Sequence, residues 1–109
     1  MANTFKLETK KNIGLLDSAV YTCPGGTDTT IIGINLANIT SSAITADVTL
    51  LNNGCDSCYL VKDAPIPIGS SLVAVGGDQK VVMNAADVIK VSSSAATSID
   101  VALSILEIT

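Results

Sequence analysis

Hydrophobic and polar residues alternate along two stretches in the first half of the chain. The first, TTIIGINLAN, places three aliphatic side chains on one predicted face: Ile32, Ile34 and Leu36. The second, AITADVTLL, does the same with another aliphatic set: Ile44, Ala46, Val48 and Leu50. A period of two is typical of half-buried β-strands, and the β-branched residues of both stretches favour strands as well.

Five further windows continue this pattern: CYLVK, SLVAVGG, QKVVMN, DVIKVSS and SIDVALSILEIT. Turn signals rich in Gly, Asn, Asp, Pro and Ser, such as DAPIPIGSS and GGDQ, separate them. The best helix candidate, NAADVIKVSSSAA, contains β-branched residues and a serine run that disfavour a helix. We therefore expect an all-β chain that folds as a single antiparallel β-sandwich of about eight strands. Its topology is expected to be jelly-roll or immunoglobulin-like.

The last window is apolar on both of its predicted faces. One face carries Val101, Leu103 and Ile105, and the other carries Ala102, Leu106 and Ile108. Such a strand either lies at the centre of the sandwich or is covered by a neighbouring subunit, and the pattern leaves both readings open.

The length of 109 residues suits one domain. We predict an N-terminal arm at residues 1–12 and a β-sandwich domain at residues 13–109. Three of the six cations lie in the arm, at Lys6, Lys10 and Lys11. They are our candidate contacts to a partner protein, and a solvated segment without a partner is the alternative interpretation.

Composition narrows the classes of function. The chain has no arginine or histidine and a net charge of −4, so it lacks the basic surface that nucleic-acid binding requires. No apolar run approaches the roughly 18 residues of a membrane-spanning helix, and the first residues lack the layout of a signal peptide. We expect neither a nucleic-acid nor a membrane partner, and assembly in a cytoplasm that keeps thiols reduced.

A C-x-x-C pair, Cys55 and Cys58, is the strongest chemical motif of the sequence. Redox catalysis places such a pair at the start of a helix, and none is predicted here. Structural zinc needs four ligands, whereas the chain offers one further cysteine, Cys23, and no histidine. We interpret the pair as a loop between strands, with free thiols as the first alternative and a Cys55–Cys58 disulfide as the second.

No constellation for catalysis or cofactor binding is evident. Serines are common, but no histidine base and no G-x-S-x-G motif accompany them. The glycine pairs match neither a phosphate loop nor a dinucleotide fingerprint. We therefore expect no enzyme activity, no cofactor and no metal.

Several stretches resemble small structural proteins from the virions of tailed phages, notably phages of cyanobacteria and other aquatic bacteria. They are YLVKDAPIP, GGDQKVV, DVIKVSS with VALSILEI, and the opening MANTFKLETKKNIG. The likeness covers almost the whole chain and lies in strand and turn patterning.

This resemblance implies a structural protein of the virion that is assembled in the host cytoplasm. The function we expect from it is capsid decoration, in which a homo-oligomer binds the major capsid protein or other virion proteins and stabilises the shell. A tail, neck or fibre component is the alternative. A glycan-binding attachment module is a third reading, with Tyr59 as its candidate aromatic.

Overall fold

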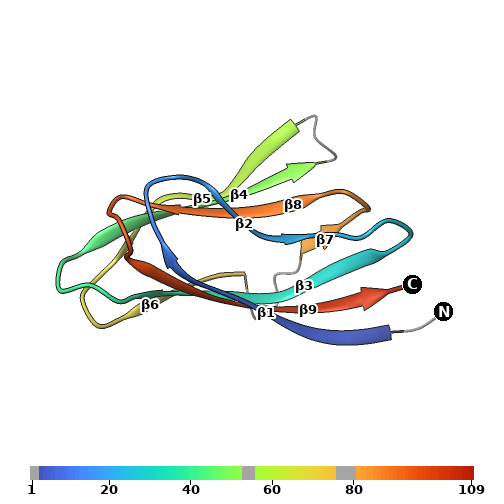
Figure 1. Cartoon of the computed structure of the whole chain (residues 1–109), viewed down its shortest axis with the longest axis horizontal. Helices are drawn as coiled ribbons and strands as arrows, with labels where there is room; N and C mark the ends of the chain where they lie inside the picture. Colours follow the sequence, from blue (N-terminus) through green and yellow to red (C-terminus); the bar gives the residue numbers. More distant parts are fainter. Residues whose placement is uncertain (1–2, 53–55, 76–80) are drawn as a thin grey trace.

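Nine antiparallel strands account for most of the residues that the computed structural model describes, which are 3–52, 56–75 and 81–109 (Figure 1). The strands are β1 (Asn3–Ile13), β2 (Ser18–Thr22), β3 (Asp28–Asn38), β4 (Ile44–Asn52), β5 (Asp56–Ile66), β6 (Ser71–Val75), β7 (Val81–Met83), β8 (Val88–Ser93) and β9 (Ile99–Ile108). The all-β class predicted from the sequence is confirmed.

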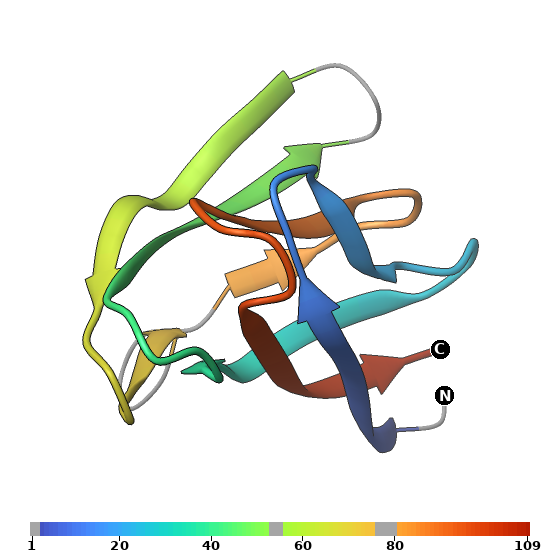
Figure 2. The same ribbon diagram turned by 60° about the vertical axis from the view of Figure 1, so that its left-hand side comes forward.

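The strands form two sheets that pack face to face, as Figure 2 shows. The first sheet has the order β1-β9-β3-β6, with the short β7 also pairing with β3, and the second has the order β2-β8-β4-β5. Apart from the additional short β7, these interleaved strand orders are the arrangement of a jelly roll. Of the two topologies left open by the sequence, the strand order selects the jelly roll.

Aliphatic side chains from the inner faces of both sheets fill the space between them. The largest fully buried ones are Ile13, Ile31, Ile34, Leu36, Ile66, Met83, Ile89, Ile99, Leu103, Ile105, Val48 and Val75. Each contributes about 1.5–3 kcal/mol relative to an exposed side chain, so this core stabilises the sandwich with almost no aromatic residues. The predicted inward set on β4 is confirmed, because Ile44, Ala46 and Val48 are buried and Leu50 packs against them.

A β-bulge in β3 changes the face that was predicted for one residue. The pairing of β3 with β9 shifts between Ile31 and Gly33, so Ile31 joins Ile34 and Leu36 in the core and Ile32 does not. The expectation that Ile32 shares a face with Ile34 was therefore wrong, because a bulge adds one residue to the alternation. Glycine suits this position, since a Cβ on Gly33 would lie 3.3 Å from the Val75 carbonyl oxygen.

Three strands contain residues that lie outside the windows that the pattern marked. Both β1 and β2 precede the first window, and β5 continues through Asp63 and Pro65, where a turn was expected. The strand tolerates Pro65 because β5 is an edge strand. Residues 3–12 of the predicted arm belong to β1, and the first buried side chain of this strand is Ile13, where the sandwich domain was predicted to begin.

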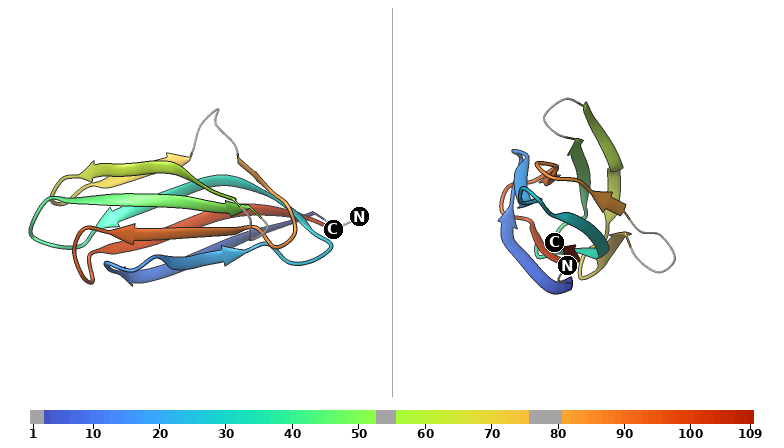
Figure 3. Two further views of the ribbon diagram at one scale, coloured as in Figure 1. Left: turned by 90° about the horizontal axis from the view of Figure 1, so that it is seen from above. Right: turned by 90° about the vertical axis from the view of Figure 1, so that its right-hand side faces the viewer.

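The two ends of the sandwich differ in what they carry. At one end Asn3 pairs with Ile108, so the two chain termini lie side by side (Figures 1 and 3). At the opposite end lie the β1–β2, β3–β4, β5–β6 and β8–β9 connections. In the part of the chain that the structure describes, no helix is long and apolar enough to cross a membrane.

Candidate functional site

The outer face of the first sheet carries apolar side chains interspersed with polar ones, most of which are uncharged. Cross-strand pairing aligns Phe5 of β1 with Leu106 of β9, Leu106 with Thr30 of β3, and Thr30 with Val82 of β7. A second row runs in the same way from Thr9 through Ala102 and Asn35 to Val73. We call this surface the apolar face, and define it by Phe5, Leu7, Val73, Val82, Ala102, Leu106 and Ile108.

Several side chains of the apolar face are open to solvent in the single chain. The exposed fractions are 76% for Phe5, 64% for Leu7, and 61% for both Val73 and Val82. Apolar side chains gathered in this way on one surface make that surface the candidate contact site of the molecule. Among the paired positions of this face, carboxylates occur only toward its ends, at Asp28 and Asp100, so a partner can cover the centre without burying a charge.

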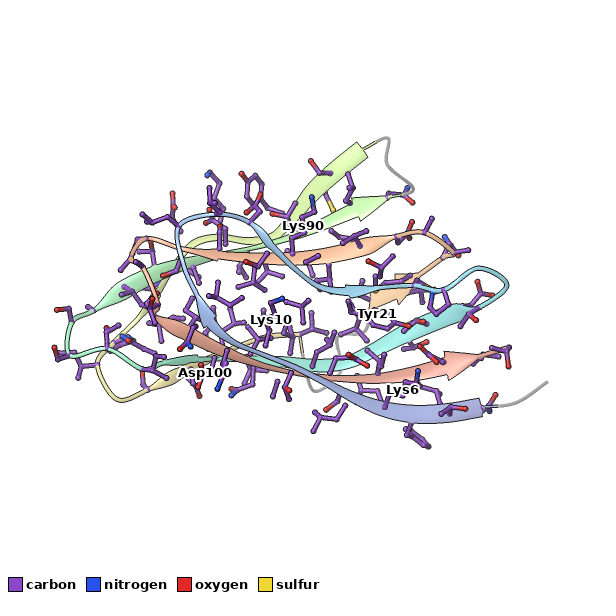
Figure 4. The ribbon with its side chains drawn as sticks, viewed as in Figure 1. Lys6, Lys10, Tyr21, Lys90 and Asp100 are labelled. Atoms are coloured by element: carbon purple, nitrogen blue, oxygen red, sulfur yellow. The ribbon has the colours of Figure 1, made fainter. Side chains whose placement is uncertain are left out.

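The outer face of the second sheet has a different character. Asp47 pairs with Ser92, and Thr49 pairs with both Lys90 and Tyr59. Figure 4 shows Lys90 on this sheet, away from the first sheet. Charged and hydroxyl side chains suit a solvated surface, so the two outer faces of the sandwich are chemically unequal.

Tyr59, the candidate aromatic for glycan binding, lies on this second face and is exposed. The Lys62 ammonium sits 4.7 Å from the centroid of its ring. A cation already occupies the space over the ring, which leaves less of the aromatic surface for stacking on a sugar.

A buried polar network ties the two sheets together near the chain termini. The Tyr21 hydroxyl donates to Glu107 Oε2 at 2.5 Å and lies 2.9 Å from Thr29 Oγ1. Lys6 Nζ lies 3.3 Å from Glu107 Oε1, and Figure 4 shows Lys6 and Tyr21 toward the same end.

The network holds a neutral tyrosine against an ionised carboxylate. The hydrogen bond from Tyr21 and the ammonium of Lys6 lower the pKa of Glu107, against the opposing effect of burial. Burial, together with the hydrogen bond to Glu107, raises the pKa of the Tyr21 hydroxyl. Every buried side-chain oxygen and nitrogen of this cluster has a hydrogen-bond partner, so we interpret the cluster as a structural clamp.

The structure separates the three candidate lysines. Lys6 is paired with Glu107, whereas Lys10 and Lys11 are exposed on the same edge strand. Lys10 pairs in register with the buried Val101, and so it points along the side of β1 that turns toward the second sheet. Lys6 and Lys10 therefore lie outside the apolar face.

The two cysteines that the structure describes, Cys23 and Cys58, are both free. Cys23 is buried, with its Sγ 3.2 Å from Thr29 Oγ1 and 3.3 Å from the Thr27 carbonyl oxygen. Cys58 is an exposed free thiol on β5. Cys55 lies outside the described residues, so the Cys55–Cys58 disulfide stays a prediction.

The described ranges contain no pocket and no group of three acidic, cysteine or histidine side chains able to hold a metal ion. Comparison with protein-family models, curated proteins and solved structures found no match to this chain. The functional argument therefore rests on the surface of the fold. Sequence reasoning missed Phe5 and Leu7 as surface residues, although their alternation with Lys6 and Glu8 carried a strand signal.

Proposed function

We propose that this protein is a capsid decoration protein, which binds an assembled phage shell through the apolar face and stabilises it. The observation that carries the proposal is that face itself, where four large aliphatic or aromatic side chains stay mostly exposed in the single chain. Such a surface gains free energy when another protein covers it, at about 25 cal/mol per Å² of apolar area.

The size of the apolar face can be compared with that of a standard contact between proteins. Four neighbouring strands spaced about 4.8 Å apart span about 19 Å, and eight residues along a strand span about 27 Å. The product is about 500 Å², somewhat below the roughly 800 Å² per partner of a standard interface. A decoration protein that binds as an oligomer compensates for a modest contact, because its linked copies engage the shell together.

The fold supports the same reading by analogy. Jelly rolls occur in viral capsid proteins and in lectin domains, and fold alone does not choose between them. The partly covered ring of Tyr59 disfavours a lectin, whereas the apolar face favours contact with another protein.

The proposal can be tested with phage shells that lack this protein. The shells are purified from the phage that encodes this chain, and the protein is added to them. Saturating occupancy of hundreds of copies per particle is expected for a decoration protein that follows the shell symmetry. A few to a few dozen copies would instead support the tail, neck or fibre alternative. No association with the particle would overturn the proposal.

Two charge insertions locate the contact. Val82→Lys and Leu106→Lys place an ammonium on the apolar face, and each is expected to lower shell affinity at least tenfold because that charge would be buried on binding. Thr49→Lys, on the outer face of the second sheet, is the matched control and should bind as the unmodified protein does. Equal binding by all three variants would exclude the apolar face as the contact.

A further inference from the structure

β1 presents the longest regular unpaired edge of the described sheets. It pairs only with β9, and its register with β9 is unbroken from Asn3 to Lys10. The edge strands β2 and β6 have five residues each, and β7 has three. β5 is as long as β1, but two register shifts, Pro65 and a φ of 50° at Asp63 interrupt it.

Natural sandwiches usually blunt such edges, because a straight row of free N–H and C=O groups accepts another strand. The backbone of β5 is interrupted in this way, whereas β1 keeps a regular backbone from Asn3 to Lys10 and carries only charged side chains as edge devices, at Lys6, Glu8 and Lys10. The first eight residues of β1 contain no proline, bulge or residue with positive φ. Lys6 and Glu8 of β1 carry opposite charges, and because they are two residues apart they lie on the same side of the strand.

We propose that a second copy of this chain pairs with β1 edge to edge, antiparallel, about a two-fold axis at Leu7. In that register Lys6 of each copy faces Glu8 of the other, which gives two opposite-charge pairs across the junction. Phe5 faces Thr9 of the second copy, and Asn3 faces Lys11, so residues 3–11 of both strands are matched. This self-complementarity is what a symmetric dimer requires.

The pairing also doubles the apolar face. The first sheets of the two copies become one continuous sheet, and Leu7 and Phe5 of each copy move from its margin to its centre, since β1 is the margin of the sheet in the single chain (Figure 2). The joined face measures about 1,000 Å², beyond the roughly 800 Å² that a standard interface needs from one partner. The partner that we propose for β1 is a second copy of the chain, and this proposal does not depend on which surface contacts the shell.

Charge reversal tests the register. Lys6→Glu and Glu8→Lys each create two like-charge pairs in the homodimer, and each is expected to weaken dimerisation about tenfold in analytical ultracentrifugation. Mixing the two variants in equal amounts restores opposite charges at both pairs, so a heterodimer of unmodified affinity should form. Dimerisation that ignores both substitutions, or an unmodified protein that stays monomeric, overturns the proposal.

Cysteine cross-linking gives a second test that leaves the charges unchanged. In a Cys55→Ser, Cys58→Ser background, Leu7→Cys puts two thiols across the axis, with Cα atoms about 5 Å apart and within reach of a disulfide. Thr9→Cys is the control, because its two copies would lie about 13 Å apart. Oxidation should give covalent dimers of the first variant only. Equal cross-linking of both variants contradicts the register.

The two proposals can fail separately. A dimeric protein that does not associate with shells would refute the decoration function and leave the β1 pairing intact. A protein that decorates shells but stays monomeric in solution and forms no Leu7→Cys dimer on the particle would refute the pairing alone.

Discussion

The Tyr21 hydroxyl of β2 and the Glu107 carboxylate of β9 meet at 2.5 Å between the two sheets. Both side chains are buried, and the bond joins residues that are 86 positions apart in the sequence. Lys6 of β1 holds the second oxygen of the same carboxylate. The Glu107 side chain of the central strand β9 thereby bonds to both the edge strand β1 and the second sheet.

Removing the hydroxyl should destabilise the fold. In Tyr21→Phe, Glu107 stays buried without its closest donor, and a hydrogen bond to a charged group contributes about 1.5–3 kcal/mol. Urea denaturation followed by circular dichroism measures this loss. Tyr59→Phe removes an exposed hydroxyl and should change the free energy of unfolding by less than about 0.5 kcal/mol. Equal effects of the two substitutions would contradict the clamp.

Acid should weaken the clamp in a defined direction. The pKa of Glu107 is lowered in the folded chain, so its stabilisation is complete above the unfolded value of about 4.3 and is lost as the pH falls through the folded pKa. The free energy of unfolding of the unmodified protein minus that of Glu107→Gln should be constant near neutral pH and shrink below about pH 4.3. If this difference in the free energy of unfolding does not depend on pH, folding does not lower the pKa of Glu107.

Asn38 should be essential for the end of the sandwich opposite the termini. Its amide nitrogen donates to the carbonyl oxygens of Ser42 and Ile66 at 2.8 and 3.0 Å, and its Oδ1 accepts from the Thr40 N–H at 2.9 Å. Asn38→Asp replaces the donor with a carboxylate oxygen facing two carbonyls, and should cost about 3 kcal/mol in thermal or urea unfolding. Asn35→Asp, on the outer face of the same strand, should cost less than about 1 kcal/mol.

The three lysines should differ in their effect on stability. Lys6→Gln removes the ion pair with Glu107 and should lower the free energy of unfolding by up to about 1 kcal/mol, since the ammonium is partly exposed. Lys11→Gln should leave stability unchanged. Added salt should reduce the difference between the two variants, because it screens the pair. If both variants unfold alike at low salt, the Lys6–Glu107 pair does not contribute.

Thiol labelling should distinguish the cysteines of the native protein. Cys58 is exposed and should react with a thiol reagent at once, whereas Cys23 is almost fully buried and should react only after unfolding. Mass spectrometry of labelled peptides assigns the sites. Protection of Cys58 that disappears on addition of a reductant would reveal the Cys55–Cys58 disulfide, and protection that persists would contradict its exposure.

Much of the fold could be predicted because buried strands carry their own periodicity. Alternation identified β4 and the inner face of β9, where each residue keeps a period of two. The pattern failed at Ile32, where a bulge inserts one residue, because the alternation cannot report such an insertion. It also failed along β1, which buries no side chain before Ile13 and so shows little hydrophobic contrast.

The candidate surface was harder to predict than the core. Phe5 and Val82 lie 77 positions apart, and only the pairing of β1, β9, β3 and β7 places them in one row. The sequence did show that the last strand is apolar on both faces. The structure explains this, since β9 is central in its sheet and its outer side chains help to form the apolar face. The pairing of strands distant in sequence is set by tertiary packing, which local patterns do not encode.

The adjacency of Asn3 and Ile108 has a practical consequence for display. A peptide fused to either end of the chain emerges from the same pole of the sandwich, beside the β1–β9 margin and away from the four connections at the far end. Cargo placed there leaves the far pole unobstructed and lies next to Phe5 and Ile108 of the apolar face. Grafting into the β3–β4 connection would project cargo from the opposite pole, so the molecule offers two separate directions of presentation on one scaffold.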